Sequence, residues 1–104
     1  MDMQLKNKTA LVTGASVGIG RGIAKALAAE GVRVAVSARR VDKLQELAAE
    51  IVAAGGHAPV IIESDLYAED AAKRLADAAL AGLGSVDILV NNAGGSRSFK
   101  ELHV

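Results

Sequence analysis

The chain has 104 residues, a length that suits one small domain. Apolar residues make up 51% of it and aromatic residues only 2%, so alanine, valine, leucine and isoleucine must fill the core. The formal net charge is zero, which argues against the concentrated basic surface that nucleic-acid binding requires. The absence of cysteine excludes disulfides and thiolate metal sites. With no signal-peptide pattern and no membrane-spanning apolar run, we expect a cytoplasmic protein with neither a membrane nor a nucleic-acid partner.

Segments with strand and helix patterns alternate along the chain. Apolar and β-branched residues predict strands over 9–13, 32–38, 59–63 and 86–91. Apolar residues at helical spacing predict helices over 17–30, 42–54 and 69–80. We expect Gly82 and Gly84 to end the last helix. Strands joined by helical crossovers run parallel, so the pattern predicts an α/β fold, the first half of a doubly wound parallel sheet.

The turn between the first strand and the first helix is rich in glycine. Gly14 permits a tight turn, Gly18 lets a pyrophosphate approach the backbone, and Gly20 lets helix and strand pack closely. Unpaired N–H groups and the helix dipole favour an anion at a helix start. Ser16 can offer its hydroxyl to a phosphate or a ribose. The turn therefore predicts a site for a phosphorylated ligand, with an empty structural turn as the alternative.

Three motifs in this order resemble the classical short-chain dehydrogenase/reductase family. Residues 13–20, Thr-Gly-x-x-x-Gly-Ile-Gly, are similar to its cofactor fingerprint. Asp65 and Leu66, after the third strand, resemble its adenine-pocket pair, and residues 91–94, Asn-Asn-Ala-Gly, resemble its second signature. The resemblance covers residues 5–94 and implies a Rossmann-type sheet of strand order 3-2-1-4 that binds a nicotinamide dinucleotide.

The same resemblance implies a role for each matching residue. Asp65 would accept a hydrogen bond from the adenine amino group, or else stabilise the positive end of the following helix. Asn91 would hold neighbouring backbone in place, while small residues at Ala93 and Gly94 leave room for a ribose. The expected cofactor-binding residues are Gly14, Ser16, Val17, Gly18, Ile19, Gly20, Arg39, Arg40, Asp65, Leu66, Asn91, Ala93 and Gly94.

The end of the second strand predicts which nicotinamide cofactor binds. An acidic residue there binds the ribose hydroxyls of NAD and repels a 2′-phosphate. Residues 37–40 read Ser-Ala-Arg-Arg and contain no carboxylate. By resemblance, Ala38 replaces the aspartate of NAD-preferring members, and Arg39 matches the basic residue of NADP-preferring ones. Arg39 and Arg40 thus predict that NADP(H) binds in preference to NAD(H). The alternative is that both arginines are ordinary solvated charges. Val17 departs from the pattern, because many NADP-preferring members have a basic residue at that position.

No catalytic or metal-binding residue is expected in this stretch. The family uses a Tyr-x-x-x-Lys pair, which the resemblance places after residues 91–94. Tyr67 is the only tyrosine, and Ala71 stands four residues later. The histidines His57 and His103 are isolated and have no metal-ligand spacing.

The whole sequence is therefore expected to be an NAD(P)-binding Rossmann domain, residues 1–104, truncated before its catalytic region. The implied parent is a homo-oligomeric oxidoreductase that transfers hydride between nicotinamide and a small carbonyl or secondary alcohol, such as a 3-oxoacyl group. A non-catalytic module that sequesters NADPH or docks on a full-length relative is the alternative. In a truncated sheet, Val86, Ile88 and Val90 of the fourth strand are expected to form an apolar edge.

Overall fold

The computed structural model describes residues 5–16, 18–65 and 70–92. Its elements follow one another as β1 (Thr9–Thr13), α1 (Gly18–Ala29), β2 (Arg33–Ala38), α2 (Val41–Ala53), β3 (Val60–Glu63), α3 (Ala71–Leu83) and β4 (Ile88–Asn91). The strands form one parallel sheet in the order β3-β2-β1-β4, which confirms the predicted Rossmann-type half-sheet. Within the described ranges, no helix has the length and apolar character needed to cross a membrane.

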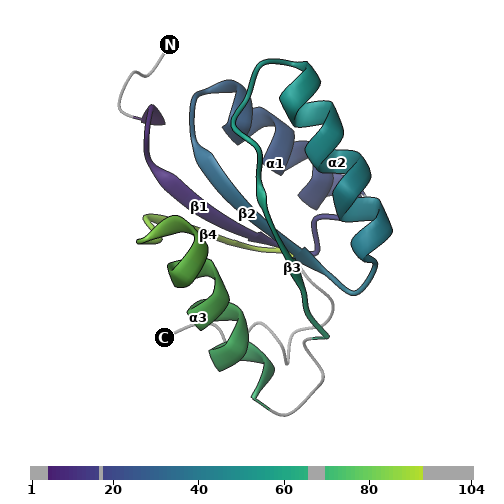
Figure 1. Ribbon diagram of the computed structural model, residues 1–104, viewed down its shortest axis with the longest axis vertical. Helices are drawn as coiled ribbons and strands as arrows, with labels where there is room; N and C mark the ends of the chain where they lie inside the picture. The colour runs from purple at the N-terminus through teal and green to yellow at the C-terminus, as the bar shows by residue number, and fades with distance from the viewer. Residues whose placement is uncertain (1–4, 17, 66–69, 93–104) are drawn as a thin grey trace.

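The sheet lies between two helical layers. Helices α1 and α2 cover one face and α3 covers the other (Figure 1). Successive residues of a strand point to opposite faces, so Val12 packs with Leu44 of α2 while Leu11 packs with Leu75 of α3. Every residue of β1 is buried, as expected for a central strand covered on both faces.

Helix α3 ends later than the sequence predicts. It runs to Leu83, and Gly84 ends it with a φ of 86° in the left-handed region. Gly82 therefore lies inside the helix and does not stop it. A Cβ at Gly82 would lie 2.8 Å from Cγ1 of Val60, so this glycine lets α3 approach β3 closely.

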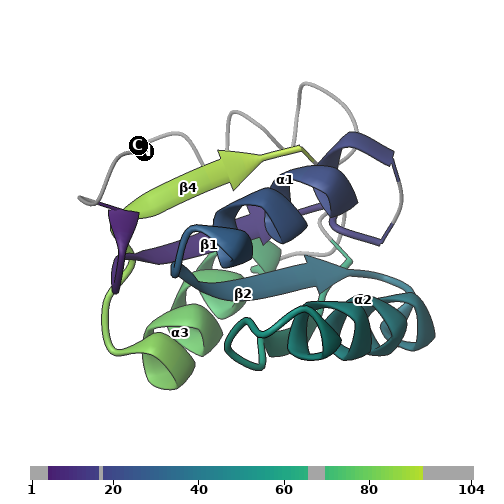
Figure 2. The same ribbon diagram turned by 90° about the horizontal axis from the view of Figure 1, so that it is seen from above.

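Strand β4 is the edge of the sheet next to β1, as Figure 2 shows. The prediction of an apolar edge strand omitted Leu89. Ile88 and Val90 are partly buried against the α1 side of the core, whereas the side chain of Leu89 is 46% exposed. Leu89 pairs in register with Leu11, whose side chain faces α3. The most exposed apolar side chain of β4 therefore lies on the α3 face.

Helix α1 packs against the end of β1 through Gly20. A Cβ at Gly20 would overlap the carbonyl oxygen of Gly14 and lie 2.7 Å from Nδ2 of Asn92. No L side chain fits there without moving backbone, which confirms the packing role predicted for this glycine. Gly22, two residues further along α1, faces open space instead, since a Cβ there would have no neighbour within 4 Å.

The amino ends of β1 and β4 are joined by hydrogen bonds in both directions between Thr9 and Asp87. The backbone N–H and the hydroxyl of Thr9 both donate to Oδ2 of Asp87, at 2.9 and 3.1 Å. The N–H of Asp87 donates back to the carbonyl oxygen of Thr9 at 3.0 Å. The backbone bond from Thr9, followed by its hydroxyl bond, lowers the pKa of Asp87.

Replacing Gly20 by alanine is expected to destabilise the fold by about 1–3 kcal/mol, because the added methyl group must displace the backbone of the glycine turn. The matched change Gly22→Ala should stabilise it by about 0.4–1 kcal/mol, since alanine is the better helix residue and fits in open space. Urea unfolding of both variants measures these free energies. Equal unfolding of Gly20→Ala and the unaltered protein would contradict the close contact.

Replacing Asp87 by alanine is expected to lower the melting temperature at neutral pH. Because the folded-state pKa of Asp87 is lowered, its contribution is complete above the ordinary aspartate pKa and disappears as the pH falls through the folded value. The difference from the unaltered protein should therefore shrink in acid. Thermal melts across this range test the sign. Asp77→Ala, which removes an exposed carboxylate paired with Lys73, is the control and should show no comparable difference.

Candidate functional site

The candidate cofactor-binding residues lie at the carboxyl ends of the strands. In register, Thr13 at the end of β1 pairs with Ser37 of β2 on one side and with Asn91 of β4 on the other. The glycine turn, residues 37–40 and residues 91–92 are therefore neighbours, although they are far apart in the sequence. The carboxyl edge of a parallel sheet is where open α/β folds bind their ligands.

The glycine turn holds the start of α1 open toward this edge. Gly14 and Gly18 have φ values of 63° and 62°, in the left-handed region that favours glycine. The N–H of Ala15 donates to the carbonyl oxygen of Ser37 at 3.1 Å and fixes the turn to the end of β2. A Cβ at Gly18 would meet no atom within 4 Å, and Ile19 is 73% exposed. The start of α1 is therefore exposed, and the N–H groups of a first helical turn suit an anion.

Thr13 joins the ends of β1 and β4 through its side chain. The N–H of Asn92 donates to Oγ1 of Thr13 at 2.9 Å, and that hydroxyl donates to Oδ1 of Asn91 at 3.1 Å. The side chain of Asn91 thus contacts Thr13 across the sheet, while the described bond from backbone is made by Asn92; the role of Asn91 in holding neighbouring backbone stays a prediction. Sequence reasoning missed both Thr13 and Asn92 as site residues. The available signal was a polar side chain at the end of an otherwise apolar strand.

The amide of Asn91 is only partly satisfied. Its Oδ1 accepts the bond from Thr13, while its Nδ2 is buried and finds no partner among the described residues.

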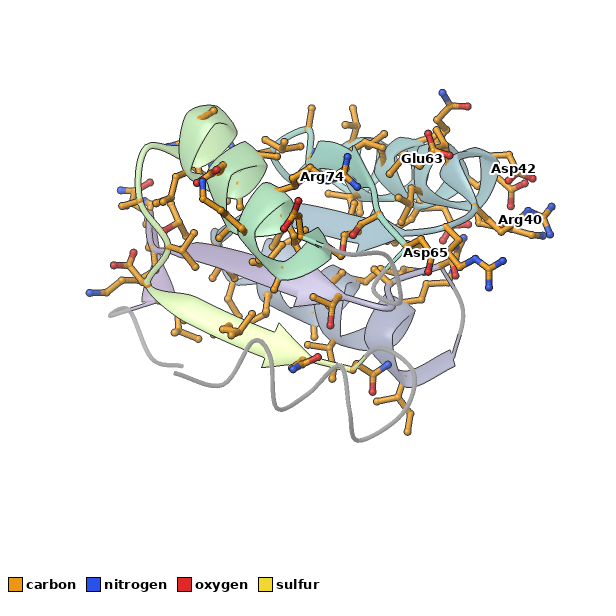
Figure 3. The ribbon with its side chains drawn as sticks, turned by 90° about the horizontal axis from the view of Figure 1, so that it is seen from below. Arg40, Asp42, Glu63, Asp65 and Arg74 are labelled. Carbon is orange, nitrogen blue, oxygen red and sulfur yellow. The ribbon has the colours of Figure 1, made fainter. Side chains whose placement is uncertain are left out.

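The two arginines after β2 differ in their surroundings (Figure 3). Arg40 is the N-cap residue of α2 and donates through Nε and Nη2 to the two carboxylate oxygens of Asp42, at 3.1 and 2.9 Å. This hydrogen bond raises the pKa of Arg40 and lowers the pKa of Asp42. Arg39 is exposed, and its side chain pairs with no acidic group within the described ranges. Arg39 is thus the arginine whose charge remains open to a ligand.

Asp65 lies beyond the end of β3, beside a hollow between β3 and α3 (Figure 3). The hollow has a volume of about 270 Å³ and is lined by Ile62, Glu63, Ser64, Asp65, Ala71, Arg74, Leu75 and Ala78. Asp65 is exposed and near the beginning of α3, which is compatible with either of its two predicted roles.

Four expected site residues, Val17, Leu66, Ala93 and Gly94, lie outside the described residues, as does Tyr67. In the part of the chain that the structure describes, no three or more metal-ligating side chains of His, Cys, Asp or Glu come together. The described candidate residues therefore offer backbone N–H groups, the hydroxyl of Thr13, side-chain amides, the carboxylate of Asp65 and two arginines, of which Arg40 is paired.

Relatives with these features are known. Residues 8–104 match the family model of the short chain dehydrogenases. A short chain dehydrogenase from Pseudocercospora fijiensis is 50% identical over 94 residues, which make up 90% of this chain and 30% of that protein.

Solved structures agree with the sequence match. A metagenomic short-chain oxidoreductase in complex with NADP has a TM-score of 0.80 and 46% identity, over 88% of this chain and 41% of that one. L-sorbose reductase from Gluconobacter frateurii, complexed with NADPH and L-sorbose, has a TM-score of 0.84 and 36% identity, over 91% of this chain and 36% of that one. The chain thus spans between 30% and 41% of these three relatives. The glycine turn, the strand order and the adjacent asparagines 91–92 agree with this match. The chain is a member of the short-chain dehydrogenase family.

Proposed function

We propose that this chain binds NADP(H) in preference to NAD(H) and forms the cofactor-binding part of a longer oxidoreductase. That enzyme would transfer a hydride between the nicotinamide and a carbonyl or secondary alcohol. The observation that carries the proposal is the open guanidinium of Arg39, which follows Ala38, the position where NAD-preferring members have an aspartate.

The start of α1 suits the diphosphate of the cofactor. Gly18 begins the helix with no neighbouring atom above it, and the bond from Ala15 to Ser37 keeps the turn in place. The N–H groups of the first helical turn can donate to phosphate oxygens, and the helix dipole favours their negative charge. Nicotinamide and adenosine would extend from here in opposite directions along the edge of the sheet.

The adenosine ribose would then lie near Arg39. A planar guanidinium binds a phosphate through charge-assisted hydrogen bonds, which are stronger than bonds between neutral groups. Ser37 and Ala38, the buried residues that precede it, have no charge to repel a 2′-phosphate. The two solved relatives in complex with NADP and NADPH support this choice of cofactor.

The cofactor, when bound, supplies or accepts the hydride, and the protein positions it and moves the proton. The described residues do the positioning: backbone N–H groups hold the diphosphate, and the Thr13–Asn91 bond keeps the end of β4 in place beside it. The sequence contains one tyrosine and no Tyr-x-x-x-Lys pair, so the proton donor would come from further chain. Residues 1–104 are accordingly proposed as the first part of one larger Rossmann domain.

Replacing Arg39 by glutamine in the complete protein is expected to weaken NADPH binding about tenfold to a hundredfold, the value of a charge-assisted phosphate contact. Binding of NADH should be unchanged, because NADH lacks the 2′-phosphate. Arg33→Gln is the matched control: it removes the same charge from the opposite end of β2. Fluorescence titration at moderate salt measures both affinities. Equal affinities of the unaltered protein for NADH and NADPH would overturn the proposed preference.

The intact mass of the polypeptide made from the native gene tests the proposed relation to a longer enzyme. A mass far above the 10.6 kDa of these residues is expected, with NADPH-dependent reduction of a carbonyl compound. A product of 10.6 kDa would overturn the proposal of a longer enzyme.

A further inference from the structure

The ion pair between Arg40 and Asp42 lies at the start of α2, beside the open Arg39. Both side chains are exposed, with 66% and 57% of their surfaces accessible, yet two nitrogen atoms of one face two oxygen atoms of the other. Figure 3 shows the two side chains pointing toward each other. A bidentate contact of this kind uses the face of a guanidinium that would otherwise bind a phosphate.

The carboxylate of Asp42 also interacts favourably with the positive end of the α2 dipole. It is the acidic residue in the first turn, where free N–H groups and the helix dipole attract negative charge. After the bond from Arg40, smaller contributions from the N–H groups of Lys43 and Asp42 itself lower the pKa of this carboxyl. The carboxylate therefore takes up two features that a 2′-phosphate would use, the second arginine and the helix start.

We propose that Asp42 is a specificity-determining residue that opposes the 2′-phosphate by holding Arg40 in an ion pair. This inference rests on the proposed function, because it concerns the same phosphate as Arg39. The preference for NADP(H) is then a balance: Arg39 attracts the phosphate, Asp42 repels it, and Arg40 contributes little while it remains paired. Removing the charge of Asp42 releases Arg40 and leaves two arginines for one phosphate.

The test compares Asp42→Asn, Arg40→Gln and the double variant in the complete protein. Adenosine 2′,5′-bisphosphate and 5′-AMP serve as probes, because they differ only in the phosphate under study. Asp42→Asn is expected to bind the bisphosphate about two- to fivefold more tightly, with 5′-AMP unchanged. Arg40→Gln alone should change little, whereas the double variant should lose the gain, since it lacks the released arginine.

Asp77→Asn is the control for net charge, because it removes an equally exposed carboxylate that is paired with Lys73 on α3. Calorimetric titration at two salt concentrations gives the affinities, and thermal melts establish that each variant is folded. An equal gain in Asp77→Asn, an equal gain for 5′-AMP, or a gain that persists in the double variant would overturn the role of Asp42.

The outcome for the unaltered protein separates this inference from the proposed function. Equal affinities for the two probes, followed by a gain for the bisphosphate in Asp42→Asn, would overturn the proposed NADP(H) preference and support the role of Asp42. Stronger binding of the bisphosphate in the unaltered protein, with no change in Asp42→Asn, would support the preference and overturn this inference.

Discussion

The hydroxyl of Thr13 is the contact on which the site depends. It accepts a bond from the N–H of Asn92 and donates one to Asn91, so a single side chain fixes the end of β1 against the end of β4. Thr13 is completely buried, and water cannot replace either bond. Asn92 is held through its backbone N–H, and its side chain limits the space above Gly20, where α1 meets β1. Strand, helix and edge strand are therefore positioned together.

In the proposed function, one set of groups binds the cofactor diphosphate and another set selects between NADP(H) and NAD(H). Backbone N–H groups in the glycine turn have the same positions whatever the neighbouring side chains are, so they suit the diphosphate, which every nicotinamide dinucleotide contains. The arginines after β2 are exposed and contribute nothing to the core, so their charges can change without cost to the fold. A cofactor preference that rests on Arg39, Arg40 and Asp42 is therefore adjustable, whereas a change at Gly20 disturbs the fold.

Much of this arrangement follows from the sequence. The bounds of β1 were predicted as observed, because a buried strand between turns has a clear apolar pattern. The end of α3 was not predicted as observed, because a glycine inside a helix cannot be distinguished in the sequence from a glycine that ends it. The contact with Val60 explains why Gly82 must be small. The Arg40–Asp42 pair was missed because it crosses the boundary between a loop and a helix, and residues 37–40 alone contain no acid. Contacts between distant segments, such as Thr13 with Asn92, cannot be deduced from local periodicity.

The position of the site follows from the handedness of the crossovers. From β1 through β2 to β3 the chain moves toward one edge, with α1 and α2 on one face, and then returns past β1 to β4. Because right-handed crossovers are strongly preferred, this reversal puts α3 on the opposite face. The carboxyl ends of β1 and β4 therefore mark the switch point of the strand order, the position where open α/β sheets bind their ligands. The glycine turn and residues 91–92 border that position, so the topology places the backbone of the glycine turn beside the edge strand that Thr13 secures.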